Sequence, residues 1–332
     1  MTPRLALVLL AGLTLSCGGG GSSPTSPSTG GSAGTTSCTT LGQCTFVRDA
    51  LRDYYYWYKE LPSPDPASFS SPEAYLDAVR YRALDSSFSY ITSKASSDAF
   101  YSDSQFIGFG LSYKRTADTE LRLAQAFPGS PAADAGMDRG DTLLTIAGKA
   151  VADLIRTGEI NTVFGAEQEG VTVAFTWRDL AGREKGATLV KRKVTIPTVS
   201  QTAVLNAGSR RVGYIHFRNF VQPSVEALNT AFTQVREAGA TELVLDLRYN
   251  GGGLVSVSQH LAGLIGGPPL VGQVFVQFTH NDKQSSRNVA YRFEAKPQAL
   301  AVSRLVVITT RGSASASEAI VNGLRPYMDV KV

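Results

Sequence analysis

Two loops of small residues carry the groups best suited to chemistry. The first, residues 248–253, follows an apolar segment at 242–247 and ends in three consecutive glycines. The second, residues 311–318, follows the apolar segment 305–310 and contains Ser313, Ser315 and Ser317. A serine hydroxyl becomes a nucleophile when a base removes its proton, and glycine lets a substrate approach the backbone closely. Because scaffolds present reactive groups where strands end, the two loops predict a reactive site.

Each loop taken alone has a simpler explanation. The three glycines could form a turn with no partner, and the serine run could cap a helix. A Ser-His-Asp hydrolase has less support, because His216, His260 and His280 are scattered and His216 lies inside a predicted strand, where packing or a cross-strand contact explains it. No Cys and His cluster has the spacing of a metal site, so we expect neither a metal nor another cofactor.

The elements around these loops alternate between strands and helices from residue 196 onward. Strands are predicted at 212–217, 242–247, 273–278, 305–310 and 329–332, and helices at 224–238 and 254–264. This alternation predicts an α/β core over 196–332.

The preceding segment, 105–195, reads as short strands and turns with one short helix. The loop Gly108-Phe109-Gly110-Leu111 precedes a short helix at 128–137 that Gly136 closes, and a strand with a tight turn follows at 140–149. This order resembles bacterial PDZ domains, which implies that residues 108–111 bind a peptide carboxylate. Successive exposed N–H groups suit that ligand, and a sheet edge can take up an extended peptide.

A small helical domain is predicted over 45–104. Apolar residues recur at helical spacing over 45–59, and Ser71 with Pro72 is a helix-start signal. The second helix is expected to bury Leu76, Val79 and Ala83.

The first 44 residues predict export. Residues 1–17 have the charge and short apolar run of a signal peptide, and they end in a sequence that resembles a bacterial lipobox with Cys17 as the lipidated residue. Ordinary cleavage with Cys17 as a bystander is the alternative. Residues 18–44 predict a flexible tether, in which Cys38 and Cys44 are expected to form a disulfide, the alternative being two unpaired thiols. The chain is therefore expected to be a lipoprotein that is anchored to a membrane and faces the periplasm or the exterior of a bacterium.

Composition limits the remaining classes. The chain has 332 residues, 43% of them hydrophobic, which is enough for two or three domains with real cores. Its net charge is only +4, and the basic residues are interspersed with acidic ones. A nucleic-acid partner is therefore not expected.

The two loops together resemble those of the C-terminal processing (tail-specific) serine proteases, the S41-type peptidases. That family has Asp-Leu-Arg-x-Asn-x-Gly-Gly where this chain has residues 246–253, and Ser-Ala-Ser-Glu where it has 315–318. The resemblance implies that Ser315 is the nucleophile, that a neutral lysine is its base, and that the N–H groups of Gly252 and Ala316 hold the oxyanion. It also implies a spiral α/β core of the crotonase or ClpP type, and substrates that are proteins or peptides with free C-termini.

The catalytic lysine has no match in this sequence. The only lysine after Ser315 is Lys331, inside the predicted strand 329–332, and the glycine-bearing turn of the family is missing. We therefore expect that the chain is a C-terminally truncated piece of a longer protein and is inactive as it stands. The alternative is a catalytically inactive, membrane-anchored protein that binds C-termini through its PDZ domain.

Overall fold

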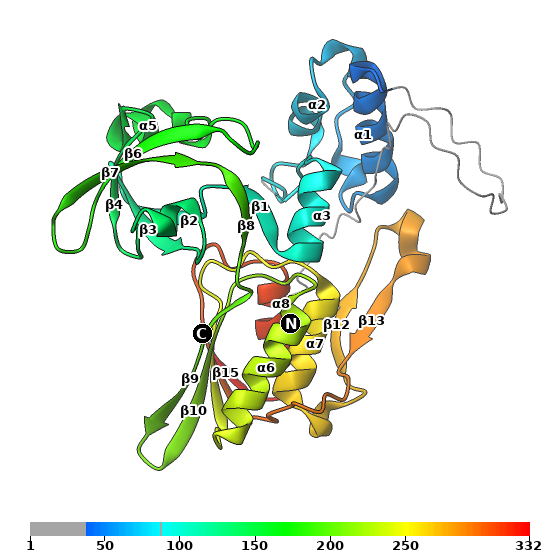
Figure 1. The fold of residues 1–332 in the computed structure, drawn as a ribbon. Coiled ribbons are helices and arrows are strands. Elements are labelled where there is room, and N and C mark those ends of the chain that lie inside the picture. Colours follow the sequence, from blue (N-terminus) through cyan, green and yellow to red (C-terminus); the bar gives the residue numbers. More distant parts are fainter. Residues whose placement is uncertain (1–37, 87) are drawn as a thin grey trace, which may run out of the picture. The chain divides into compact units, whose positions relative to one another are not determined.

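The computed structural model describes residues 38–86 and 88–332, which form two compact units. The first contains residues 38–94 together with 272–293, and the second contains 95–271 and 294–332 (Figure 1). The predicted signal peptide, most of the tether and the lipidation site Cys17 lie outside the described residues.

The first unit is built on two helices, as expected, with different bounds. Helix α1 covers Thr40–Tyr54, and its N-cap Thr39 accepts a hydrogen bond from the N–H of Gly42. It therefore begins inside the segment predicted as a tether. It ends at Tyr54, whereas the predicted helical pattern extends to Lys59. Helix α2 covers Pro72–Val79 with Ser71 as its N-cap, as predicted, but Ala83 lies beyond its end and is exposed. Short 3₁₀ turns η1 and η2 cover Tyr58–Glu60 and Pro66–Ser68.

The state of Cys44 contradicts the expected disulfide. Its thiol is free and completely buried, among the side chains of Leu51, Tyr55 and Tyr75. The expected bridge between Cys38 and Cys44 is therefore wrong. Residue 44 lies inside α1, where its thiol packs in the hydrophobic core of the first unit.

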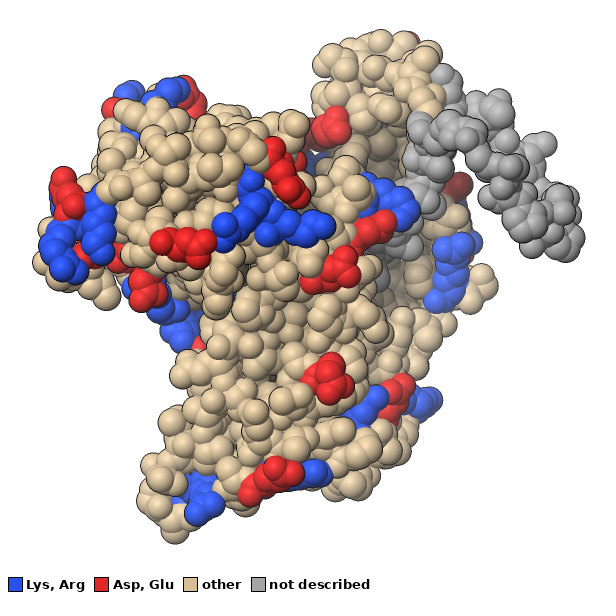
Figure 2. Space-filling model, in the orientation of Figure 1, with Lys and Arg blue, Asp and Glu red and all other residues tan. Residues whose placement is uncertain are grey.

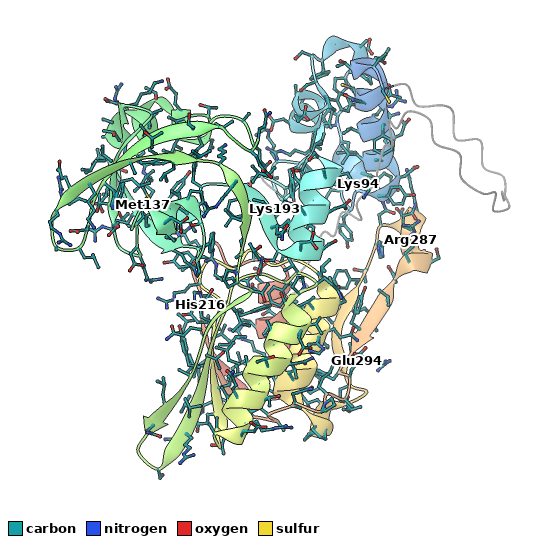
Figure 3. The ribbon with its side chains drawn as sticks, viewed as in Figure 1. Lys94, Met137, Lys193, His216, Arg287 and Glu294 are labelled. Atoms are coloured by element: carbon teal, nitrogen blue, oxygen red, sulfur yellow. The ribbon has the colours of Figure 1, made fainter. Side chains whose placement is uncertain are left out.

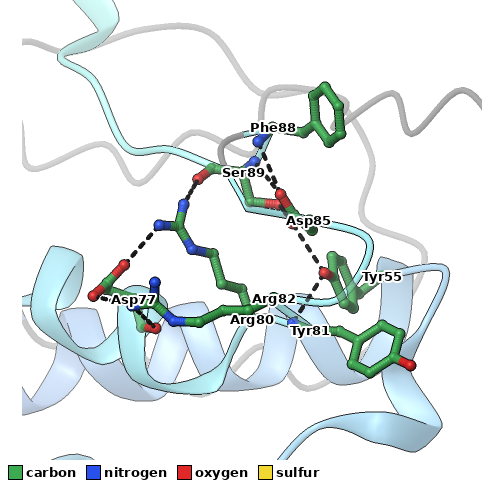
Figure 4. A network of polar contacts seen from close by, with 8 residues as sticks. All are labelled: Tyr55, Asp77, Arg80, Tyr81, Arg82, Asp85, Phe88 and Ser89. Carbon is green, nitrogen blue, oxygen red and sulfur yellow. Dashed lines mark hydrogen bonds and ion pairs between the residues drawn. The ribbon is translucent and has the colours of Figure 1, made fainter.

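A buried carboxylate organises the loop after α2 (Figure 4). Asp85 accepts hydrogen bonds from the hydroxyls of Tyr55 and Ser89 and from the backbone N–H groups of Phe88 and Ser89. The Tyr55 hydroxyl also accepts from the N–H of Tyr81. Burial raises the pKa of Asp85, but these hydrogen bonds outweigh it, and the pKa lies below its usual value.

A hairpin from late in the chain belongs to the first unit. Strands β12 (Val274–Phe278) and β13 (Val289–Arg292) pair antiparallel, and η5 (Asp282–Arg287) lies between them. The Asn281 side chain donates to the backbone carbonyls of Asp53 and Tyr55, at the end of α1. The sequence predicts 273–278 as a strand of the α/β core, but the strand partner of this segment is β13.

The predicted PDZ domain is mainly an antiparallel sheet in the order β2-β3-β4-β6-β7, with β5 beside β4. Its elements are β2 (Leu111–Ala117), β3 (Glu120–Ala126), β4 (Thr142–Ile146), β5 (Lys149–Ala150), β6 (Thr172–Arg178), β7 (Glu184–Val190), α4 (Pro131–Asp134), α5 (Val151–Thr157) and η3 (Glu159–Asn161). A separate pair, β1 (Gln105–Gly108) and β8 (Arg192–Thr195), runs antiparallel at the borders of the domain. The short helix predicted at 128–137 covers only Pro131–Asp134, and its N-cap is Ser130. Gly136, predicted to close it, has a positive φ of +76°.

The core sheet of the second unit has the order β15-β14-β11-β10-β9, and all its neighbours except β9 and β10 are parallel. Its elements are β9 (Val199–Ala207), β10 (Arg210–Phe217), β11 (Glu242–Asp246), β14 (Arg304–Ile308), β15 (Asp329–Lys331), α3 (Lys94–Asp103), α6 (Ser224–Glu237), α7 (Val255–Gly266), η4 (Pro268–Leu270) and α8 (Ala316–Leu324). Because β11 and β14 are parallel neighbours, the two candidate loops leave the sheet at the same edge.

Charges of both signs mix on the surface. On the face drawn in Figure 2, Lys and Arg lie beside Asp and Glu. Several of these neighbours form exposed ion pairs, for example Arg178 with Glu184 and Arg210 with Glu242. Exposed pairs of this kind contribute little to stability, about 1 kcal/mol or less each.

Candidate active site

Strand register brings the two loops together. Asp246, the last residue of β11, pairs with Ile308, the last residue of β14. The N–H of Leu247 then donates to the carbonyl of Ile308, which extends the ladder by one more bond. The glycine loop and the serine loop therefore start side by side.

Asn250 joins the loops and is completely buried. Its backbone carbonyl accepts hydrogen bonds from the Ala314 N–H at 3.3 Å and from the Ser317 hydroxyl at 2.9 Å. Its side-chain nitrogen donates to the carbonyl of Phe217 at 3.0 Å, and its side-chain oxygen accepts from the Gly252 N–H at 2.9 Å. One residue thus ties the end of β10, the glycines and the start of α8 into a single structure.

Two more serines hold the same region. The Ser313 hydroxyl donates to the Leu247 carbonyl at 2.7 Å and accepts from the Thr310 N–H at 3.0 Å. The Ser258 hydroxyl, from α7, donates to the Ala316 carbonyl at 3.2 Å. Ser313 and Ser317 therefore have partners in the neighbouring loop, whereas Ser315 is the N-cap of α8 and forms a capping box with Glu318.

Gly252 lies directly against Ser315. A Cβ atom placed on Gly252 would be 2.7 Å from the Ser315 Cβ, 2.8 Å from the Ala314 carbonyl oxygen and 2.9 Å from the Ala316 nitrogen. Gly252 also has a φ of +101°, a conformation that side-chain-bearing residues rarely adopt. Only glycine fits here, so the backbone itself faces the serine.

Ser315 has a strained backbone at the start of a helix. Its φ is +57° and ψ is −116°, values that cost about 1–3 kcal/mol for a residue other than glycine and are typical of functional sites. Its N–H donates to the Glu318 carboxylate at 2.8 Å. Ala316 follows as the first residue of α8, so its N–H precedes the helical hydrogen-bond ladder and lies at the positive end of the helix dipole.

A buried ion pair between Asp246 and Arg248 stabilises the start of the loop 248–253. The Asp246 carboxylate is fully buried and accepts from the Arg248 backbone N–H and guanidinium and from the Tyr214 hydroxyl. Burial raises the pKa of Asp246, but these donors outweigh it and hold the pKa below its usual value. Arg248 therefore shapes the turn that leads to Asn250.

His216 lies beside this ion pair, where it has no catalytic contact with Ser315. It lies in β10 at the register position of Asp246 and is buried (Figure 3 labels it). Burial lowers its pKa, so the ring is neutral at pH 7. Its position in a strand and its burial confirm the prediction of a packing residue.

No base reaches Ser315 within the described part of the chain. In residues 38–86 and 88–332, no hydrogen bond joins the Ser315 hydroxyl to a lysine or a histidine. Lys331 is a strand residue, as predicted: it lies in β15, is largely exposed and pairs with Asp329 at 2.7 Å. Nor do the described residues contain a group of three or more His, Cys, Asp or Glu side chains that could hold a metal ion.

A cavity of about 280 Å³ opens beside the glycine loop. It is lined by Phe100, Tyr101, Ile196, Arg218, Asn219, Tyr249 and the glycines 251–253. A peptide chain entering it would meet the Gly252 backbone, which lies against Ser315.

Family models match two separate parts of the sequence. Residues 211–332 match the model of peptidase family S41, and residues 42–90 match the model of the peptidase S41 N-terminal domain. The chain belongs to peptidase family S41. The family assignment thus covers both the N-terminal helices and the sheet that carries the candidate site.

Individual relatives agree with the S41 family. The chain is 27% identical over 232 residues to the chloroplastic C-terminal processing peptidase of Tetradesmus obliquus, covering 66% of this chain and 47% of that protein. It is 28% identical over 227 residues to the carboxyl-terminal-processing protease of Picosynechococcus, covering 66% of this chain and 50% of that protein. The chain therefore spans about half the length of these curated relatives.

A solved structure agrees on the fold. A crystal structure of a Bacteroides fragilis protein assigned to the S41 proteases superposes with a TM-score of 0.65 at 25% identity. The match covers 86% of this chain and 76% of that one. The predicted family and the mixed α/β fold with a helical N-terminal region are both confirmed.

In this S41 chain, the three predicted catalytic positions lie together, and sequence reasoning missed two neighbours. A Cβ placed on Gly252 would come within 2.9 Å of atoms of both Ser315 and Ala316, which are consecutive residues. Asn250 was missed as the residue that ties the loops, although its place in the motif after β11 was visible. Arg218 was missed because nothing in the sequence shows that a residue just past a strand will be buried with two guanidinium nitrogens that have no hydrogen-bond partner among the described residues.

The segment predicted to bind a peptide carboxylate connects β1 to β2. Gly108 ends β1, Gly110 has a φ of +75°, and Leu111 begins β2. The Phe109 ring is buried in the domain core, 5.1 Å from the ring of Phe175. Phe109 therefore anchors this segment, and its carbonyl accepts a hydrogen bond from the Ala132 N–H at 2.9 Å. Residues 108–110 are buried.

Finally, no helix within the described residues is long and apolar enough to cross a membrane.

Proposed function

We propose that this chain carries the site of a serine endopeptidase that cleaves near the C-termini of proteins. Ser315 attacks the substrate carbonyl, and the N–H groups of Gly252 and Ala316 hold the negative charge that develops on its oxygen. The observation that carries the proposal is the close approach of Gly252 to Ser315, in which the Gly252 position leaves no room for a side chain. Losing one oxyanion donor typically costs about 3–4 kcal/mol of activation free energy.

The Gly252 N–H has to change partner for this role. It donates to the Asn250 side chain at 2.9 Å. An oxyanion is a stronger acceptor than a neutral amide, since charge-assisted hydrogen bonds are roughly twice as strong. The glycine at φ +101° has the backbone freedom for the peptide to rotate toward the substrate.

The base in this proposal is a neutral lysine, as the family resemblance implies. Because no described lysine contacts Ser315, we expect the 332-residue chain by itself to show no peptidase activity. Substrate selection falls to residues 105–195, proposed as a PDZ domain. Its strand β2 starts at Leu111, the last residue of the segment 108–111, and lies at the end of the sheet order, where an extended peptide tail can add as a further strand.

Peptide turnover tests the catalytic proposal. The protein expressed from its native gene should cleave a quenched fluorescent peptide with a free C-terminus, and Ser315→Ala should lower kcat by at least about 10³-fold. Ser209→Ala, in the exposed turn between β9 and β10, is the matched control and should leave kcat unchanged. Turnover that survives Ser315→Ala would refute the assignment. Tight peptide binding with no turnover would favour a binding protein instead.

We also propose export and lipidation at Cys17. The support is the leader-like composition of residues 1–17. Metabolic labelling with a radioactive fatty acid should mark the protein, and Cys17→Ala should remove the label. A label that persists in Cys17→Ala would contradict this anchor.

A further inference from the structure

Arg218 is a buried cation with unused hydrogen-bond donors. Only 9% of the residue is exposed, and within the described residues its Nε and Nη1 atoms have no hydrogen-bond partner. Its guanidinium lies 5.5 Å from the ring centroid of Tyr249 and 5.6 Å from that of Phe127. Leaving such donors buried and unpaired is costly, so a position of this kind calls for an explanation.

The surroundings supply no counter-ion. The residues that line the cavity with Arg218 include no Asp or Glu. Asp246 favours the charged form of Arg218 from a distance, but its own oxygens are engaged by Arg248 and Tyr214. Burial lowers the pKa of Arg218, yet a guanidinium stays protonated at neutral pH. The two rings hold the cation in place by cation–π contacts without using its N–H groups.

A neighbouring side chain adds the complementary group. Asn219 also lines the cavity, and its amide nitrogen donates to the Ser104 hydroxyl at 3.1 Å, which fixes the side chain. Its amide oxygen is buried and, among the described residues, has no partner. The cavity therefore offers charged donors from Arg218 and one acceptor from Asn219, next to the Gly252 backbone.

We propose that Arg218 is a specificity-determining residue that binds a carboxylate of the substrate in this cavity, within one or two residues of the bond facing Ser315. This inference rests on the proposed function for its place beside the scissile bond. A guanidinium binds a carboxylate through two parallel hydrogen bonds, and Asn219 can accept the N–H of the same residue. The cavity volume, about 280 Å³, lies just below the range of about 300–1,000 Å³ that is usual for ligand sites, and it fits only a short segment.

The carboxylate has two possible sources, the substrate C-terminus and an Asp or Glu side chain. Equilibrium binding of short peptides separates them, measured by calorimetry on the Ser315→Ala protein so that no turnover occurs. One pair is acetyl-tetra-alanine with a free carboxylate and with a carboxamide. The other pair is acetyl-Ala-Ala-Asp-Ala-amide and its Asn analogue, in which the C-terminus is blocked.

We expect at least one carboxylate peptide to bind tighter than its neutral analogue, and Arg218→Gln to reduce this preference about tenfold or more. Any preference of the predicted PDZ domain for free C-termini is the same in both proteins and cancels in the comparison. The peptide pair whose difference in affinity disappears in Arg218→Gln identifies the source of the carboxylate. Arg218→Lys should show an intermediate preference because it keeps the charge and loses the planar fork.

Arg139→Gln is the matched control. Its guanidinium lies 6.0 Å from the same Tyr249 ring, but Arg139 is exposed and does not line the cavity. Arg139→Gln should keep the preference for the carboxylate peptide within twofold of the parent protein. The melting temperature of Arg218→Gln should equal or exceed that of the parent, because a buried unpaired charge is removed.

Two results would overturn the inference. Either the preference survives in Arg218→Gln, or neither carboxylate peptide binds better than its neutral analogue, in which case the cavity holds only water or neutral groups. If Arg218→Gln does not fold, an unchanged preference in Arg218→Lys overturns it in the same way. The Arg218 variants are compared at equilibrium in the same Ser315→Ala background, so the change in peptide preference is a separate readout from the kinetic test of Ser315.

Discussion

The Cα of Gly252 lies so close to Ser315 that an added methyl group would sit 2.7 Å from the Ser315 Cβ. Two loops separated by about sixty residues in the chain thus meet at a point where a peptide carbonyl can be attacked and its charge held. The Asn250 carbonyl, which accepts from Ala314 and Ser317, fixes this arrangement.

Gly252→Ala should abolish activity without unfolding the protein. The new methyl group would press on the Ala314 carbonyl oxygen and the Ala316 nitrogen, which are backbone atoms that cannot swing away. We expect kcat to fall at least about 100-fold and the free energy of unfolding to fall by about 1–3 kcal/mol. Peptide turnover and thermal melting check this.

Gly170→Ala is the control for Gly252→Ala. Gly170 has a similar φ, +85°, but a Cβ there would meet nothing within 4 Å. It should therefore show the cost of backbone strain, about 1 kcal/mol, with no loss of activity. Equal activity losses in the two variants would mean that the close approach to Ser315 is irrelevant.

Asp246→Asn should be strongly destabilising because it leaves the Arg248 guanidinium without its buried partner. Breaking a buried ion pair by removing one partner usually costs about 3–5 kcal/mol. Arg248 is partly exposed, so water can solvate the remaining charge, and we expect a loss of about 3 kcal/mol in chemical denaturation. Asp329→Asn, whose pairs with Arg304 and Lys331 are at the surface, should change stability much less.

The pH dependence of the same carboxylate has a definite sign. The folded pKa of Asp246 is lower than that of an unfolded Asp, so its contribution is fully present above about pH 4 and is lost as pH falls through the folded pKa. Asp246→Asn should therefore flatten the acid limb of the stability curve. An acid limb that is identical in the two proteins would contradict the proposed role of this pair.

His260 predicts a second, milder pH effect. Its Nε2 hydrogen-bonds the Asn229 side-chain oxygen at 2.8 Å, and burial, helped by the positive charge of Lys296, lowers its pKa to about 4. An unfolded His has a pKa of about 6.5, so the unfolded state takes up protons first and stability falls between about pH 6.5 and 4. Because the ring is only partly buried, we expect a loss on the order of 1–2 kcal/mol.

The His260 effect can be isolated by substitution. His260→Gln keeps a donor for Asn229 but does not titrate, so its unfolding free energy should be flat over this window while the parent curve slopes. Parallel curves for the two proteins would show that other groups cause the slope.

Much of the architecture could be predicted from local patterns. Ser71 with Pro72, Ser130 with Gly136, and the alternating segments from 212 to 247 formed the predicted elements, because caps, positive-φ turns and apolar periodicity act over a few residues. The misplaced segments depend on distant contacts. Residues 274–278 have the composition of a core strand, but their partner is β13 and Asn281 ties the hairpin to α1.

The chain's residues alone determined the family and the motifs that contain Ser315 and Gly252, because these depend on contiguous stretches of sequence. Only the tertiary structure decided that Cys44 is a buried free thiol, that Asn250 connects both loops, and that the Nε and Nη1 atoms of Arg218 are buried without hydrogen-bond partners among the described residues. Each of these facts depends on which groups from distant parts of the chain surround a side chain. Burial and hydrogen-bond satisfaction are properties of that environment, and local sequence does not encode them.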